Sequence, residues 1–237
     1  MPSKGKITPS QFAKMMNYRS KEIRATGTKK QDIIDWITAN GGTVPEKTTI
    51  PELTAIMNAM PPSQVISEFT QTAISYADEV IMDILGVERE QISAKALEHG
   101  NTYEPVARAS YEIERFCTVP TIDESIPHPI YDFVAGIPDG LVYDDGIIEI
   151  KCPSNSANHL SNILQPTQYE DYKYQIQGYL WITGRKWCDF VSYDPRFPKH
   201  LQIAIHNIKR DEELIQLIET RAVEFWALIQ ERLKRYL

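Results

Sequence analysis

The chain has 237 residues, of which 42% are hydrophobic and 24% are charged. This composition is typical of one globular domain of about 100–200 residues with a small addition, and it excludes collagen-like, coiled-coil and disordered chains. No apolar run reaches the ~20 residues of a membrane span, and the opening residues MPSKGKITPS lack the apolar core of a signal peptide. We therefore expect a cytoplasmic protein that makes no membrane contact.

The net charge of −7 is unevenly distributed along the chain. Residues 1–30 carry eight Lys or Arg and one acidic residue, and residues 185–210 carry six basic and two acidic residues. The remainder of the chain is therefore strongly acidic. A basic N-terminal arm on an acidic body is typical of a protein that meets a polyanion on one face, and an ordinary solvated surface is the alternative.

The N-terminal quarter of the sequence predicts short helices. Residues 8–18 and 28–40 each carry apolar side chains at helical spacing. The chain then runs extended and re-enters a helix near Pro51, so residues 20–62 predict a helix–extended–helix insertion. Small modules of that shape bind DNA, and a helical cap over the main core is the alternative.

The rest of the chain alternates between helical and strand-like patterns. A break is expected near Gly100, and Asp145-Gly146 between alternating apolar runs is a strong hairpin signal. The order of the elements indicates an α/β or α+β core. The predicted helices cover residues 63–85, 92–116, 168–183 and 211–235, and the predicted strands cover 118–122, 130–135, 140–143, 146–151, 187–193 and 201–208.

The stretch GIPDGLVYDDGIIEIKCP, residues 136–153, gathers charged groups around the predicted hairpin. Asp139 precedes the turn, and Glu149 and Lys151 share one face of the following strand because side chains alternate. The hairpin can fold Asp139 back towards Glu149, so that two carboxylates and one ammonium meet. On a buried strand such charges are costly unless they pair or bind a metal.

Paired carboxylates beside a backbone carbonyl form a hard oxygen site that suits Mg²⁺ or Mn²⁺. Such a metal binds phosphate and lowers the pKa of a bound water. Lys151, within ~4 Å of two carboxylates, is expected to stay protonated and to orient the water electrostatically. For an isolated ExK pattern, the alternative is an amphipathic hairpin with solvated charges.

PDG followed by ExKCP at this spacing resembles the signature of the PD-(D/E)xK nucleases, and the fuller string resembles their lambda exonuclease and YqaJ-type viral recombinase family. The resemblance covers residues 5–18 and about 63–212. It is carried further by GKITPSQFAKMM (5–16), KALEHGNTYEPVARASYE (95–112), YKYQIQGYLWIT (172–183) and FVSYDPRFP (190–198).

The resemblance implies a restriction-endonuclease-like core, in which helices flank a central mixed β-sheet, within a single nuclease domain spanning residues 1–237. It implies a Mg²⁺-dependent 5′→3′ exonuclease, with Mn²⁺ as a substitute, that degrades one strand of linear double-stranded DNA and leaves 3′ overhangs. The implied partners are DNA ends, a single-strand annealing protein and further copies of the chain in a ring-shaped trimer. A phage or prophage origin in a bacterial host is implied as well.

Carried over position by position, the resemblance makes Asp139 and Glu149 metal ligands, joined by the backbone carbonyl of Ile150. Glu104 binds the metal or its water, and a surface helix glutamate is the alternative for this residue. Lys151 positions the nucleophile.

The resemblance also assigns residues around the DNA. Gln175 supports Lys151 or the scissile phosphate, and a hydrogen-bonded core residue is the alternative. The arginine that contacts the 5′-phosphate in the family has no counterpart, and Lys4 or Lys6 is expected to substitute for it as a point charge. The expected DNA contacts are Lys6, Thr8, Ser10 and Tyr172.

Two other functions fit the same residues. The first is an endonuclease, or a RecB-like nuclease with another end or sequence preference. An iron–sulfur version of the latter is not expected, because three scattered cysteines (Cys117, Cys152 and Cys188) do not supply four cluster ligands. The second is a catalytically silent DNA-binding protein, which the intact set of charges around the hairpin argues against.

Overall fold

The computed structural model describes residues 4–25, 27, 29–88 and 95–237. The chain divides into two compact units, one formed by residues 1–16 and 72–237 and the other by residues 17–71. Among the described residues, no helix is long and apolar enough to cross a membrane.

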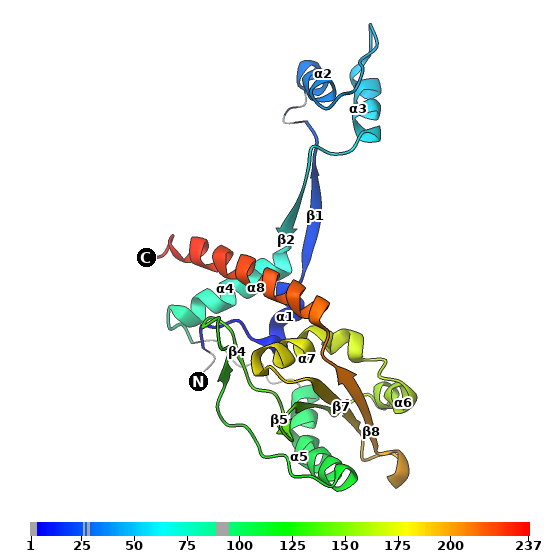
Figure 1. Cartoon of the computed structure of the whole chain (residues 1–237), viewed down its shortest axis with the longest axis vertical. Coiled ribbons are helices and arrows are strands. Elements are labelled where there is room, and N and C mark those ends of the chain that lie inside the picture. The colour runs from blue at the N-terminus through cyan, green and yellow to red at the C-terminus, as the bar shows by residue number, and fades with distance from the viewer. Residues whose placement is uncertain (1–3, 26, 28, 89–94) are drawn as a thin grey trace. The chain divides into compact units, whose positions relative to one another are not determined.

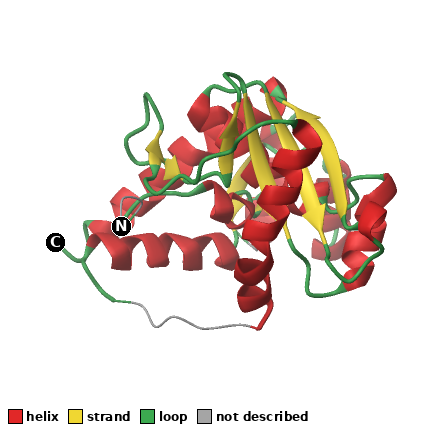
Figure 2. Ribbon diagram, turned by 90° about the horizontal axis from the view of Figure 1, so that it is seen from below, coloured by secondary structure: helices red, strands yellow, loops and turns green. Residues whose placement is uncertain are grey.

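A four-stranded mixed sheet with strand order β5-β6-β7-β8 forms the centre of the larger unit (Figure 2). β5 (Gly140–Val142) and β6 (Gly146–Lys151) form the antiparallel hairpin expected at the Asp-Gly turn. β6 runs parallel to β7 (Trp187–Tyr193), and β7 pairs antiparallel with β8 (Ile203–Lys209). Because β6 and β7 are inner strands covered on both faces, nearly all of their residues are buried.

Helices cover the two faces of this sheet (Figure 2). α5 (Lys95–Arg115) packs its buried residues Ala107 and Tyr111 against the face that carries Ile148 and Ile150. α6 (Ser156–Leu164) and α7 (Tyr169–Thr183) lie against the opposite face, since side chains alternate along β6 and β7. Glu149 and Lys151 therefore point towards the α7 side.

The outer helices complete the larger unit. α4 (Gln71–Ile84) and α8 (Glu212–Leu233) contact each other through the stacked rings of Tyr76 and Phe225, whose centroids are 5.4 Å apart. The N-terminal segment forms a short 3-10 turn, Pro9–Gln11, followed by α1 (Phe12–Met15). Both pack on α7.

The smaller unit is a two-stranded stem that leads to a pair of helices (Figure 1). β1 (Tyr18–Ile23) pairs antiparallel with β2 (Gln64–Phe69). α2 (Lys30–Ala39) and α3 (Ile50–Ala59) share a small apolar core of Ile33, Ile37 and Leu53.

Two helices predicted from the sequence are shorter in the structure, because the stem takes up some of their residues. The predicted helix over residues 63–85 begins only at Gln71, and the predicted helix over 8–18 ends at Met15. β2 pairs with a strand more than forty residues earlier, so the ladder overrides the local helical pattern. Ser63, at the start of the predicted helix, instead donates its backbone N–H to the carbonyl of Ile23 across the stem.

Several other boundaries also differ from prediction. α5 runs unbroken through Gly100, because its packing on the sheet overrides the local glycine signal. Residues 92–94 of that predicted helix lie outside the described residues. Residues 118–122 form no strand. Of residues 130–135 only Ala135 belongs to a named strand, β4 (Ala135–Gly136), which pairs with β3 (Ile126–Pro127). α6 was not predicted.

Gly146 leaves room for a tryptophan at the hairpin. A Cβ on Gly146 would lie 2.2 Å from the Trp187 ring, which a 2.9 Å hydrogen bond from Nε1 to Asp145 holds in place. Gly146→Ala is therefore expected to lower the free energy of unfolding by about 1–3 kcal/mol, measured by denaturant titration. Gly100→Ala is the matched control: nothing lies within 4 Å of its Cβ, and it should stabilise the helix by about 0.5–1 kcal/mol. Equal effects from the two substitutions would contradict the packing described.

Candidate active site

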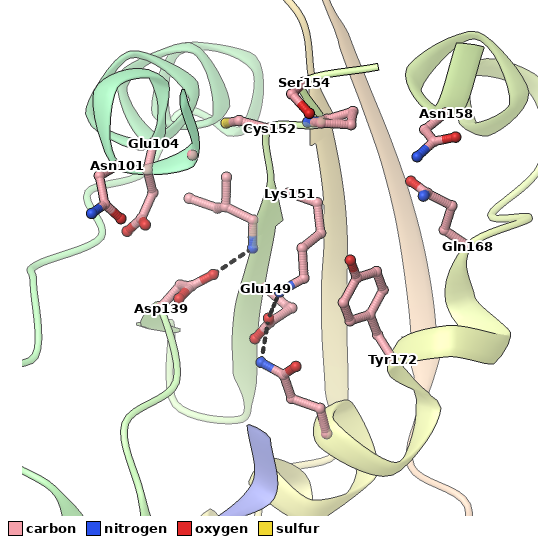
Figure 3. A pocket seen from close by; sticks show the side chains of 14 residues that line it. Asn101, Glu104, Asp139, Glu149, Lys151, Cys152, Ser154, Asn158, Gln168 and Tyr172 are labelled. Atoms are coloured by element: carbon pink, nitrogen blue, oxygen red, sulfur yellow. Dashed lines mark hydrogen bonds and ion pairs between the residues drawn. The ribbon is translucent and has the colours of Figure 1, made fainter. Parts of the chain in front are cut away.

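A polar pocket of about 450 Å³ opens where the C-terminal end of β6 meets α5 and α7 (Figure 3). It brings together side chains from four separate parts of the larger unit. The residues predicted from the sequence that line it are Glu104, Asp139, Glu149, Ile150, Lys151, Tyr172 and Gln175.

Asp139 reaches β6 through a backbone contact. β5 begins at Gly140, which pairs with Ile148, so the last residues of β6 extend beyond the end of their neighbour. The N–H of Ile150 has no β5 partner at that level and donates instead to Oδ2 of Asp139 at 2.6 Å (Figure 3). The hairpin thus fixes one carboxylate beside the end of β6.

Glu149 is 1% exposed, and its two carboxylate oxygens differ in their surroundings. Oε1 accepts a hydrogen bond from Nε2 of Gln175 and pairs with Nζ of Lys151, each at 2.6 Å. Oε2 is buried and has no hydrogen-bond partner among the described residues. A buried carboxylate oxygen without a donor is unusual in folded proteins and indicates a place for a missing ion or water.

The two carboxylates perturb each other electrostatically. Burial raises the pKa of Asp139 well above its ordinary range, and the adjacent Glu149 raises it further. Burial also raises the pKa of Glu149, although Lys151 opposes this effect. Ionising both groups is therefore unfavourable unless a cation joins them.

Lys151 places a positive charge in the pocket, beside Glu149. Burial disfavours its ammonium form, but the attraction of Glu149 outweighs burial and raises the pKa of Lys151. Its Nζ also lies 4.3 Å from the centroid of the Tyr172 ring, a cation–π contact. Lys151 is therefore held as a cation at the pocket, where 23% of its side chain is exposed.

Glu104 lies on α5 at the edge of the same pocket, with 39% of its side chain exposed. It pairs with Arg108 one turn later on the helix, at 3.1 Å. Across the described residues, no three His, Cys, Asp or Glu side chains gather closely enough to hold a metal ion. The carboxylate pair Asp139 and Glu149 is therefore the compact part of the site, and Glu104 faces it across the pocket.

The donor set still fits a hard divalent cation. Asp139 and Glu149 offer carboxylate oxygens, one of them buried and without a donor, and the carbonyl of Ile150 belongs to the same strand end. Oxygen ligands of this kind suit Mg²⁺, which keeps several waters and is commonly bound by one or two carboxylates. These residues could hold the ion with water completing its shell.

A family model matches the stretch of the chain that carries the pocket residues. The family model of the YqaJ-like viral recombinase domain matches residues 55–186, more than half of the chain. The chain belongs to this family.

Three solved structures, of two different proteins, resemble this YqaJ-like chain over nearly its whole length. An alkaline exonuclease from Laribacter hongkongensis, LHK-Exo, is 29% identical, with a TM-score of 0.70 over 99% of this chain and 92% of that one. The same enzyme in complex with dAMP gives 30% identity and a TM-score of 0.69, with the same coverage. A phage-related exonuclease from Haemophilus somnus 129PT, 19% identical with a TM-score of 0.64, shares the fold over 98% of this chain and 96% of that one.

A curated relative matches only in part. The uncharacterized protein YqaJ of Bacillus subtilis (strain 168) is 26% identical over 133 residues, which is 56% of this chain and 41% of that protein. The resemblance to the YqaJ-type family and the mixed α/β fold predicted from the sequence are both confirmed.

The N-terminal residues predicted to contact DNA lie on a different part of this YqaJ-like fold. Thr8 donates its backbone N–H to the hydroxyl of Tyr76 at 2.9 Å, and its own hydroxyl lies 3.3 Å from that of Ser10. Lys6, Thr8 and Ser10 are not among the described residues that line the pocket, whereas Tyr172 is. Their contacts with DNA stay a prediction.

Tyr179, to which the sequence-based prediction gives no role, contacts a residue of the pocket without lining it. Gln175 and Tyr179 are four residues apart, so they share one face of α7. Tyr179 is buried and hydrogen-bonds Gln175, the amide that holds Glu149. Burial and the two nearby carboxylates raise the pKa of Tyr179, so its hydroxyl stays neutral. The spacing of the two residues on the helix was the signal that could have found it.

Asp139→Asn is expected to weaken cation binding without lowering the stability of the folded protein. The amide keeps an acceptor for the N–H of Ile150 but removes one buried charge, so thermal stability in EDTA should equal or exceed that of the wild type. Mg²⁺ at ten times its dissociation constant should stabilise the wild type by about 1.4 kcal/mol and the variant far less. Asp144→Asn, at an exposed turn position, is the control and should behave as the wild type. An equal Mg²⁺ shift in Asp139→Asn would place the ion elsewhere.

Proposed function

We propose that this YqaJ-like chain is a Mg²⁺-dependent 5′→3′ exonuclease. It degrades one strand of linear double-stranded DNA and leaves 3′ overhangs for recombination by single-strand annealing. The observation that carries the proposal is the free, buried Oε2 of Glu149 beside Asp139 and Lys151. The similarity to an alkaline exonuclease that was crystallised with a mononucleotide supports the same chemistry.

Hydrolysis of a phosphodiester needs a positioned water and stabilisation of negative charge, rather than a covalent nucleophile. A divalent cation, when bound, supplies neutralisation of the phosphate and a water of lowered pKa. Asp139 and Glu149 would hold that cation, and Gln175 fixes Oε1 of Glu149, while Oε2 has no donor among the described residues. Glu104, at the edge of the pocket, would bind the cation or one of its waters.

Lys151 acts through its charge. Its raised pKa keeps the ammonium protonated at neutral and mildly alkaline pH, so it cannot serve as a general base there. Glu149 and the Tyr172 ring fix its Nζ, and from this position it orients the water and stabilises charge on the phosphate oxygens. Such preorganised charge contributes more than a mobile lysine because nothing has to reorganise during the reaction.

The proposal includes the DNA contacts expected from the sequence. Tyr172 meets the DNA beside Lys151, and Lys6, Thr8 and Ser10 bind the phosphate at the 5′ end. The basic N-terminal arm supports this assignment. Lys6→Ala is expected to weaken binding of 5′-phosphorylated duplex about threefold to tenfold and to leave 5′-hydroxyl duplex unchanged, measured by fluorescence anisotropy. Equal weakening of both duplexes would contradict a 5′-phosphate contact.

A ring-shaped trimer and a single-strand annealing partner belong to the same proposal. A ring that encloses duplex DNA would keep the enzyme on one strand for many turnovers. Light scattering of the purified protein tests the trimer: a monomer at micromolar concentration would remove the ring from the account.

A paired digestion tests the activity. With Mg²⁺, the wild type should degrade 5′-phosphorylated linear duplex to mononucleotides, starting from the 5′ ends, and leave covalently closed circular duplex intact. Lys151→Ala should reduce the rate at least about 100-fold while DNA binding is retained, because it removes charge stabilisation at the reacting phosphate. Lys234→Ala, at the exposed end of α8, is the matched control and should keep full activity.

Other outcomes would select other functions. Cutting of the circular duplex would indicate an endonuclease on the same core. Degradation from the 3′ ends would reverse the polarity. Binding of DNA without cleavage by the wild type would indicate a silent DNA-binding protein.

A further inference from the structure

The segment that leaves the catalytic strand forms part of the pocket wall. Cys152, Pro153 and Ser154 follow Lys151 directly and all three line the pocket (Figure 3). They belong to no helix or strand, so the backbone ladder that fixes β6 does not fix them. Side chains, by contrast, do bond the backbone of this segment.

Arg196 supplies those contacts. Its Nη1 donates to the carbonyl of Ser154 and its Nη2 to the carbonyl of Pro153, each at 3.0 Å. The same guanidinium grips Asp194 with two further bonds, from Nε at 2.7 Å and from Nη2 at 2.8 Å. A planar guanidinium can make these bonds together because its donors diverge in a rigid fork.

Asp194 anchors the arginine to the sheet. It follows β7 directly, is 0% exposed, and donates its backbone N–H to the carbonyl of Gln202 at 2.9 Å. Its carboxylate also bonds the side chain of Ser156, the first residue of α6. Burial alone would raise the pKa of Asp194, but the bonds from Arg196 hold it at about 2, so the carboxylate is charged under all ordinary conditions.

The pair therefore closes a ring of contacts around the end of β6. Lys151 pairs in register with Ser192, two residues before Asp194, and Arg196 then reaches back to the residues that follow Lys151. The loop is thereby tied to the neighbouring strand at the level of the active site.

We propose that Arg196, held by Asp194, is a positioning residue of the nuclease centre: it fixes the Pro153–Ser154 wall and so the strand end that carries Lys151. This inference rests on the proposed nuclease function. The competing role is direct binding of a DNA phosphate, since 46% of the Arg196 side chain is exposed. The two roles predict different kinetics, because a positioning residue acts on kcat whereas a phosphate contact acts on KM and on the salt dependence of binding.

Labelling of Cys152 tests the wall without reference to activity. Cys152 lies in the held segment and Cys117 lies away from the pocket, so Cys117 is an internal control. In Arg196→Ala, alkylation of Cys152 by iodoacetamide, followed by peptide mass spectrometry, should accelerate about tenfold as the wall opens, with Cys117 unchanged. An unchanged rate at Cys152 would overturn the positioning role.

Kinetics on 5′-phosphorylated linear duplex test the consequence for the reaction. Arg196→Ala should lower kcat about 10- to 100-fold with KM within about twofold, since small displacements of a reacting group have effects of this size. Arg196→Lys should recover part of kcat, because one ammonium can bond Asp194 or a carbonyl but not all three partners. Arg235→Ala, which removes an exposed ion pair with Glu231, is the matched control and should be silent.

Asp194→Asn tests the same role with a smaller change in structure, in case Arg196→Ala does not fold. It keeps the shape of the side chain, loosens the grip on Arg196 and should lower kcat in the same direction. The double variant with Arg196→Ala should be no worse than Arg196→Ala alone, because the two residues act as one unit. A raised KM with a smaller salt slope in Arg196→Ala, and unchanged kcat, would assign Arg196 to DNA binding instead. An inactive wild type would overturn the proposed function, and the Cys152 labelling would still decide whether Arg196 holds the wall.

Discussion

Burial of Glu149 within an inner strand is the constraint on which the rest of the site depends. A carboxylate at 1% exposure is costly unless its charge is compensated, and here both compensating groups contact the same oxygen. Gln175 and Lys151 both meet Oε1, so the second oxygen keeps its full capacity to bind a cation. Asp139 lies beside Glu149, and its raised pKa disfavours the ionised form unless a cation is bound. The burial of these two neighbouring carboxyl groups raises the pKa of both, which is the electrostatic basis of the proposed cation site.

The architecture explains how these groups are held. β6 is parallel to β7, so both strands end at the same edge of the sheet, and the segment between them passes through α6 and α7. α7 returns along the face that carries Glu149 and Lys151, which brings Gln175 and Tyr172 to them. α5 covers the other face and presents Glu104 at the rim of the pocket. Each element therefore supplies one part of the centre.

The hairpin and its charges could be predicted from the sequence because the signals are local. The Asp-Gly turn and the alternation along 146–151 set which side chains share a face, and the structure agrees. α6 gave no such signal because its polarity is inverted: His159 and Asn162 are buried while Leu160 and Leu164 are exposed. The β1–β2 stem and the contacts of Arg196 join residues some forty positions apart, which no local pattern contains.

Anomalous diffraction from crystals of the metal-free protein soaked in Mn²⁺ would show whether Asp139 and Glu149 bind a divalent cation. We expect one strong peak in each larger unit, within about 2.5 Å of Oε2 of Glu149 and of the Asp139 carboxylate. The pairing of Oε1 with Lys151 and Gln175 should be unchanged in that structure. An anomalous peak at another site would contradict this expectation. So would a pocket without a peak in which a protein N–H or O–H group donates a hydrogen bond to Oε2.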